Sequence, residues 1–196
     1  EWDGRYSGEQ VWSGNPNGAL VREAGSLSAG RALDVGAGEG GDAVWLAEQG
    51  WSVTAIDVAR RAIDQLADVA SSRGLPIDAR QADANARHPF DTAAFDLVTA
   101  HYASIPRTPA GRAVANLLDA VALGGTLLVV GHDPEAMRDA TDEHHPSRMF
   151  DPDAYVGPDD FARVLDESLD WEITSHEKRP RPPGASSGHH VDDVVL

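Results

Sequence analysis

The sequence contains no cysteine, only two methionines, and half as many basic as acidic side chains. The absence of cysteine excludes disulfide bonds, thiolate zinc sites and cysteine nucleophiles, and it is typical of a cytosolic protein. Long apolar runs are also absent, so no segment is expected to span a bilayer. Because no N-terminal signal pattern is present either, we expect a cytoplasmic protein.

The shortage of basic residues, 16 against 32 acidic ones, gives the chain a formal net charge of −16. A surface this acidic repels phosphate backbones and anionic lipids, so neither nucleic acid nor a membrane is expected as a partner. A small molecule, neutral or cationic, is the easier substrate. The 196 residues, 41% of them hydrophobic, are expected to form one domain over 1–196, as a monomer or a homodimer.

One stretch, Leu33–Asp57, has the features of a nucleotide-binding unit. An apolar segment that suits a strand buried on both faces leads into Gly36, Gly38 and Gly40, which favour a tight turn and let the backbone approach a ligand. The helix after the turn would present its N-terminal N–H groups to that ligand. Asp57 ends the next apolar segment, where a Rossmann-type unit offers a carboxylate to ribose hydroxyls. The stretch therefore predicts a cofactor that contains a nucleoside.

Helical and strand patterns alternate along the rest of the chain. Thr108 is the expected N-cap of one helix, and Gly124–Gly125 is its expected end. The alternation predicts an α/β fold with a parallel sheet and right-handed crossovers, and a C-terminal hairpin predicts antiparallel strands at its edge. The expected helices cover residues 16–24, 62–73, 108–121 and 158–166, and the expected later strands cover 76–82, 95–100, 126–130, 171–176 and 191–196.

Asp34 bears most directly on the class of cofactor. It stands two positions before Gly36, and an acidic residue there is not part of the dinucleotide-binding pattern. A carboxylate beneath the turn would repel a pyrophosphate and attract a cationic ligand. S-adenosylmethionine carries a sulfonium and an ammonium but no phosphate, so it is favoured. A nicotinamide-dependent oxidoreductase or epimerase remains an alternative, although the Tyr-x-x-x-Lys pair common in that class is absent. A non-catalytic protein that binds S-adenosylmethionine is a second alternative.

These motifs resemble those of the class I S-adenosylmethionine-dependent methyltransferases. Residues 33–40 are similar to the family's first motif, Asp57 to its ribose-binding acid, and Asp83 to the acid that accepts from the adenine amino group. Residues 95–98 look like the family's fourth strand. The turn into the fifth strand departs from the pattern, because Leu123 replaces the usual proline. The resemblance implies a Rossmann-like, doubly wound sheet of seven strands, mostly parallel, with an antiparallel strand from the C-terminal hairpin.

The same resemblance implies which segments surround the ligands. Within the N-terminal arm and helix, 1–30, the residues Trp2, Asp3, Tyr6 and 12–17 look like those of a small bacterial subgroup related to tellurite-resistance and thiopurine-type methyltransferases, in which this segment closes over the cofactor. Residues 132–157 are expected to form a lid over the acceptor. The cofactor is S-adenosyl-L-methionine, and its expected contacts are Trp12, Asp34, Gly36, Ala37, Gly38, Gly40, Asp57, Val58, Ala82, Asp83, Ala84, Ala100 and His101.

The acceptor side is less defined. Tyr102, His132, His144 and His145 are expected to line it, and no histidine spacing matches a zinc pattern. His101 is the candidate general base, because an unperturbed imidazole titrates near neutrality. The alternative is a satisfied histidine at a strand end, since alignment and exclusion of water can supply most of the acceleration of methyl transfer. Oxygen, nitrogen, sulfur and metalloid acceptors all remain open.

Overall fold

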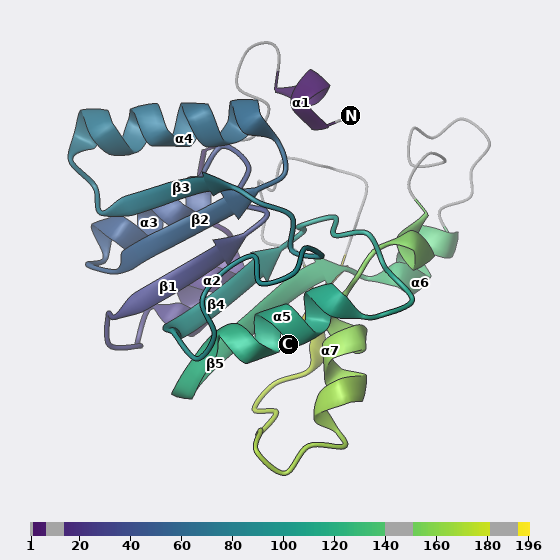
Figure 1. Cartoon of the computed structure of the whole chain (residues 1–196). Helices are drawn as coiled ribbons and strands as arrows, with labels where there is room; N and C mark the ends of the chain where they lie inside the picture. The colour runs from purple at the N-terminus through teal and green to yellow at the C-terminus, as the bar shows by residue number, and fades with distance from the viewer. Residues whose placement is uncertain (1, 7–13, 140–150, 181–191) are drawn as a thin grey trace.

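The computed structural model describes residues 2–6, 14–139, 151–180 and 192–196. In this part of the chain a seven-stranded sheet has the order β3-β2-β1-β4-β5-β7-β6 (Figure 1). β1 to β5 are parallel, whereas β7 is antiparallel to both β5 and β6. The predicted fold class is therefore confirmed. The strands are β1 (Arg31–Val35), β2 (Ser52–Asp57), β3 (Ile77–Gln81), β4 (Phe95–His101), β5 (Val121–His132), β6 (Glu177–Pro180) and β7 (Asp192–Val195).

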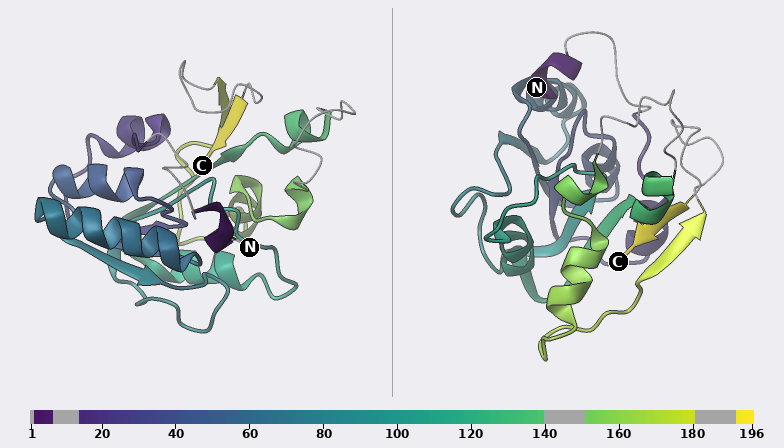
Figure 2. Two further views of the ribbon diagram at one scale, coloured as in Figure 1. Left: turned by 90° about the horizontal axis from the view of Figure 1, so that it is seen from above. Right: turned by 90° about the vertical axis from the view of Figure 1, so that its right-hand side faces the viewer.

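Helices cover both faces of the sheet. On one face α2, α3 and α4 bury apolar side chains against the strands, and on the other face α5 and α7 do the same. Figure 2 shows the C-terminal strands at the opposite end of the sheet from α4. None of the helices in the described ranges is long and apolar enough to cross a membrane. The helices are α1 (Trp2–Arg5), α2 (Gly18–Ala24), α3 (Gly41–Glu48), α4 (Arg60–Arg73), α5 (Arg112–Ala120), α6 (Pro134–Asp139) and α7 (Pro158–Leu165), with a 3-10 turn η2 at Pro152–Ala154.

The start of α5 differs from the sequence prediction. Thr108 is not its N-cap, because the chain before the helix is held extended: Pro106 forms a β-bridge with Tyr155, and the Arg107 N–H donates to the carbonyl of Ala154 at 2.8 Å. The helix begins only after Gly111, whose φ of 58° is in the left-handed region. Contacts with a distant segment have overridden a favourable local capping sequence.

The end of α5 also differs. The helix ends at Ala120 and β5 begins at once, so Gly124–Gly125 lies inside the strand rather than at the helix end. Phe95 of β4 pairs with Val121, but Leu97 pairs with Thr126, so the longer stretch of β5 bulges between these pairs. Gly124, with a φ of 76°, accommodates the bulge.

The antiparallel C-terminal strands are confirmed, but the predicted first strand at 171–176 is wrong. Trp171 and Ile173 pack, half-buried, against the core on the α5 and α7 face instead of pairing with a strand. β6 therefore begins at Glu177 and pairs with β7, which inserts between β6 and β5.

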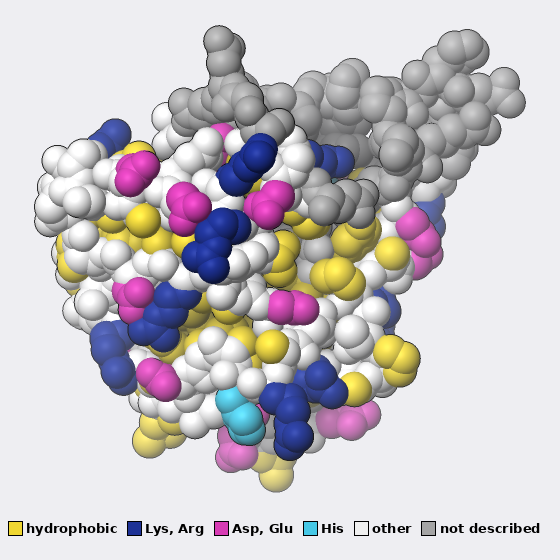
Figure 3. Space-filling view, turned by 45° about the horizontal axis from the view of Figure 1, so that its top comes forward, with side chains coloured by type: hydrophobic (Ala, Val, Ile, Leu, Met, Phe, Trp, Pro, Cys, Tyr) yellow, Lys and Arg dark blue, Asp and Glu magenta, His cyan; other side chains and the backbone are white. Residues whose placement is uncertain are grey.

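On the face seen in Figure 3, acidic and basic side chains are interspersed, so the net negative charge does not form a single patch there.

Candidate active site

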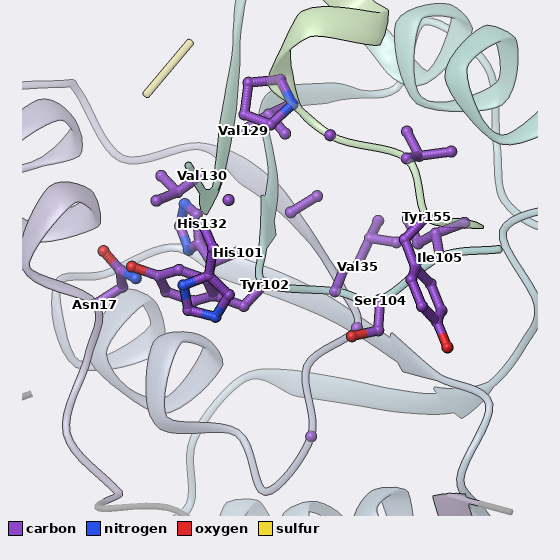
Figure 4. Close-up of a pocket in the computed structure, with 18 of the residues that line it drawn as sticks. Asn17, Val35, His101, Tyr102, Ser104, Ile105, Val129, Val130, His132 and Tyr155 are labelled. Atoms are coloured by element: carbon purple, nitrogen blue, oxygen red, sulfur yellow. The ribbon is translucent and has the colours of Figure 1, made fainter. Parts of the chain in front are cut away.

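A cavity of about 1300 Å³ opens at the carboxyl ends of the parallel strands, beside the turn between β1 and α3. Small-molecule pockets in proteins measure roughly 300–1,000 Å³, so there is room for a cofactor and a second molecule. Ligands of doubly wound sheets bind at this edge. Figure 4 shows Asn17, His101, Tyr102 and His132 on one side of the cavity, and Ser104, Ile105 and Tyr155 on the other.

The glycine turn lies where the sequence predicts it, but two of its glycines are required by packing within the protein. Gly36 has a φ of 75°, and a Cβ there would lie 2.6 Å from the Cβ of Ala103. Gly40 has a φ of 86°, and its Cβ would lie 2.2 Å from a methyl of Leu66. At these two positions the space is filled by neighbouring side chains and not left for a ligand. The turn nevertheless lines the cavity.

Asp34 lies at the end of β1 and is only 2% exposed. One carboxylate oxygen accepts a hydrogen bond from the Thr99 hydroxyl at 3.1 Å. The other is buried and has no hydrogen-bond partner among the described residues. Burial, reinforced by the nearby charge of Asp42, raises the pKa of Asp34 to about 7. A buried carboxylate without a partner is costly, so this site suits a ligand that brings a positive charge or an N–H donor.

Asp57 ends β2 and is held in one orientation by the backbone. Its carboxylate accepts the N–H of Gly38 at 2.9 Å and the N–H of Ala59 at 2.8 Å. Asp57 is not the N-cap of the following helix, because Ala59 is the N-cap residue of α4. Each carboxylate oxygen can accept a further hydrogen bond, and Asp57 lines the cavity.

The remaining predicted cofactor residues in the described ranges also border the cavity. Asp83 is exposed, and its carboxylate accepts the N–H of Asn85 at 2.8 Å, which fixes the loop after β3. Trp12, His144 and His145 lie outside the described residues. The predicted residues that line the cavity are Asp34, Gly36, Ala37, Gly38, Gly40, Asp57, Val58, Ala82, Asp83, Ala84, Ala100, His101, Tyr102 and His132.

His101 ends β4 and forms a buried pair with Asp42, a residue that the sequence analysis did not select. Its Nδ1 lies 2.6 Å from a carboxylate oxygen of Asp42, in the first turn of α3. The side chains of His101 and Asp42 are only 3% and 15% exposed. Nε2 of His101 is buried, with no hydrogen-bond partner in the part of the chain that the structure describes.

Tyr102 and His132 lie together on one side of the cavity, where both contact Asp193, a second residue that the sequence did not indicate. The Tyr102 hydroxyl donates to Asp193 at 2.6 Å, and His132 Nδ1 lies 3.5 Å from the other Asp193 oxygen. The Tyr102 and His132 rings are 4.6 Å apart and tilted by 32°. His132 and Asp193 are direct partners across the antiparallel β5–β7 ladder. Only the pairing of β5 with β7 brings His132 and Asp193 together.

The family model of a methyltransferase domain matches residues 32–125, from the start of β1 to the bulge in β5. The same region contains the glycine turn, Asp34, Asp57 and His101. This match spans slightly less than half of the chain, and it identifies the region as a methyltransferase domain. The motifs that resemble those of the class I methyltransferases therefore lie within a matched methyltransferase domain, and the match supports methyl transfer as the chemistry. No curated protein matches it significantly.

Solved structures share its fold. One is described in connection with the conversion of a disulfide bond into a thioacetal group during echinomycin biosynthesis, with a TM-score of 0.70 and 22% identity over 99% of this chain and 89% of that one. TehB from Haemophilus influenzae has a TM-score of 0.67 and 19% identity over 91% and 59%. A putative S-adenosylmethionine-dependent methyltransferase from Methanococcus maripaludis has a TM-score of 0.58 and 19% identity over 91% and 81%. At these sequence identities the similarity shows a shared fold and nothing further.

Proposed function

We propose that this methyltransferase binds S-adenosyl-L-methionine in the cavity and methylates a small soluble molecule. The observation that supports this most strongly is the buried, unpartnered carboxylate oxygen of Asp34 beneath the glycine turn. It fits the ammonium group of the cofactor and opposes a pyrophosphate, which disfavours a nicotinamide dinucleotide. The raised pKa of Asp34 agrees with a site whose missing partner is a cation.

The residues present match the parts of the cofactor along the edge of the sheet. Asp34 would hold the ammonium side, with the glycine turn beneath the methionine. Asp57, already oriented by two backbone N–H groups, would bind the ribose hydroxyls. Asp83 would accept from the adenine amino group, and the side chains of Val58 and Ala84 would pack on the base. When bound, the cofactor supplies a methyl group on a sulfonium, whose carbon–sulfur bond breaks with its electron pair left on sulfur, so that S-adenosylhomocysteine is the product.

The acceptor would occupy the other end of the cavity, between the end of β4 and the β5–β7 pair. Tyr102, His132 and Asp193 would orient it through hydrogen bonds, because their side chains line this end and are fixed by one another. Arg107 supports the opposite wall: its guanidinium donates to the carbonyls of Asp153 and Tyr155 at 3.1 and 2.9 Å. A wall tied in this way would exclude water and align the acceptor, which can supply much of the acceleration of methyl transfer.

The test is formation of S-adenosylhomocysteine from S-adenosylmethionine with a panel of thiols, phenols, hydroxyl compounds, heterocycles and metalloid oxyanions. Sulfur compounds belong in the panel because one structural relative is described in connection with the conversion of a disulfide bond. We expect acceptor-dependent product with at least one class, and Asp57→Ala should lower its rate of formation when S-adenosylmethionine is subsaturating. Binding of S-adenosylhomocysteine without turnover of any class would instead favour the non-catalytic alternative. Cytoplasmic location and oligomeric state stay predictions.

A further inference from the structure

The buried contact between His101 and Asp42 defines which nitrogen of the imidazole carries the proton. A carboxylate can only accept hydrogen bonds, so Nδ1 is the donor at the 2.6 Å contact with Asp42. In the neutral ring the lone pair then lies on Nε2. That nitrogen is buried, without a hydrogen-bond partner in the described ranges, in a side chain that lines the cavity. An orphaned acceptor at such a place indicates a ligand that brings a proton to it.

Asp42 is itself held in place by one contact on each of its carboxylate oxygens. One of its oxygens receives His101, and the other accepts the backbone N–H of Asn17 at 2.5 Å. The N-terminal segment lies against the start of α3, since a Cβ on Gly41 would lie 2.8 Å from the Asn15 carbonyl oxygen. Asp42 therefore joins this segment, α3 and the end of β4. Asp42 can therefore act on the reaction through His101, in addition to the effect of its charge on the pKa of Asp34.

We propose that Asp42 is a positioning residue that holds His101 in the Nδ1–H tautomer, so that Nε2 accepts the proton of a protic acceptor, an O–H or N–H compound. The inference rests on the proposed function and narrows its substrate class. Nε2 takes the proton from the acceptor, the electron pair of that O–H or N–H bond stays on the acceptor as the nucleophile, and the imidazolium is stabilised by the Asp42 carboxylate. A carboxylate that fixes the tautomer of a histidine base and stabilises its charged form is an established catalytic arrangement.

The first experiment measures the tautomer without any acceptor. The imidazole ¹⁵N resonances of the full chain, with and without S-adenosylhomocysteine, distinguish protonated from unprotonated nitrogen, and the His101→Gln spectrum assigns the His101 signals. We expect Nε2 to be unprotonated in the neutral wild-type ring. Asp42→Asn should shift the ring to the Nε2–H tautomer, because the amide N–H can donate to Nδ1. A protonated Nε2 in the neutral wild-type ring, or the same tautomer in Asp42→Asn, would overturn the proposal.

The matched control is Asp96→Asn, at the opposite end of β4, where the carboxylate accepts the N–H of Arg31 at 2.8 Å. It should leave the His101 tautomer unchanged. Urea unfolding of both variants shows whether each is still folded, so that a change of the His101 tautomer can be distinguished from a loss of the fold.

The second experiment measures turnover with a protic acceptor from the panel. We expect Asp42→Asn to lower kcat by about 10²–10⁴-fold, the usual contribution of a positioned base, while the Kd for S-adenosylhomocysteine stays within about twofold. Added to His101→Gln, it should lower kcat no further. An unchanged kcat in Asp42→Asn overturns the inference alone, whereas a wild type that does not bind S-adenosylhomocysteine overturns the proposed function.

Discussion

Replacement of Asp34 by asparagine should raise the free energy of unfolding of the ligand-free protein and weaken its binding of S-adenosylhomocysteine. Asparagine is nearly isosteric, so Asp34→Asn can keep the hydrogen bond from the Thr99 hydroxyl while removing the buried ionisable group. In the folded protein, burial and the charge of Asp42 raise the pKa of Asp34 to about 7 from an ordinary value of 3.8. The unfolded chain loses this proton at the ordinary value, and the folded chain keeps it until near neutrality.

The sign of the effect follows from proton linkage. Above the unfolded pKa the unfolded chain binds fewer protons at this site, so the wild-type free energy of unfolding falls as pH rises towards about 7 and is level above it. One pKa unit corresponds to about 1.4 kcal/mol, so the wild type should lose about 2 kcal/mol relative to Asp34→Asn between about pH 5.5 and about pH 7.5. Titrating groups far from Asp34 are shared by the two proteins and cancel in the difference, whereas Asp42, His101 and Asp57 interact with Asp34 and contribute to it.

The assay is urea unfolding of both proteins across this pH range at fixed ionic strength. Calorimetry with S-adenosylhomocysteine provides the functional counterpart. If the ligand ammonium requires ionised Asp34, the wild-type affinity should rise about 20-fold from about pH 5.5 to about pH 7.5, and the weak affinity of Asp34→Asn should not change. A stability difference independent of pH, together with pH-independent wild-type affinity, would refute the assignment of Asp34.

Three further predictions concern other parts of the site. Gly40→Ala should lower the free energy of unfolding by about 3 kcal/mol, because φ is 86° and the new methyl would lie 2.2 Å from a buried leucine. Gly74→Ala, with a φ of 63° and open space around it, should cost only about 1 kcal/mol, and equal costs by urea unfolding would contradict the packing argument. Asp57→Ala should weaken S-adenosylhomocysteine binding by roughly 10–100-fold in calorimetry, while Asp78→Ala, away from the cavity, should not; an unchanged Kd in the former would remove the ribose assignment. Arg107→Ala should speed amide exchange in the segment before α7 by about tenfold or more without changing that Kd, since it removes the guanidinium contacts to two carbonyls there, and unaltered exchange would show that the wall does not depend on them.

The predicted residues that the structure brings to the cavity lie at the ends of strands that local sequence patterns predict. Asp34 and Asp57 each end a buried strand, and the carboxyl ends of neighbouring parallel strands meet at one edge of a sheet. Once the alternation of strands and helices is recognised, their convergence follows from the fold. His101 was found for the same reason, at the end of β4.

The contacts that were missed depend on the tertiary fold. Asp42 was visible as an acid just after the glycine turn, but nothing in the chain indicated that it faces His101 across the sheet edge. Asp193 reaches His132 only because β7 inserts beside β5. The start of α5 was placed too early at Thr108, since the bridge from Pro106 to a segment far along the chain decides it.

The most direct test of the central claim, that this cavity binds a cationic nucleoside cofactor, is calorimetric titration of the wild-type protein with S-adenosylhomocysteine, NAD and NADP at about pH 7.5, above the pKa of Asp34. We predict saturable binding of S-adenosylhomocysteine and no heat from either dinucleotide. Tight binding of NAD or NADP with no S-adenosylhomocysteine signal would contradict the account.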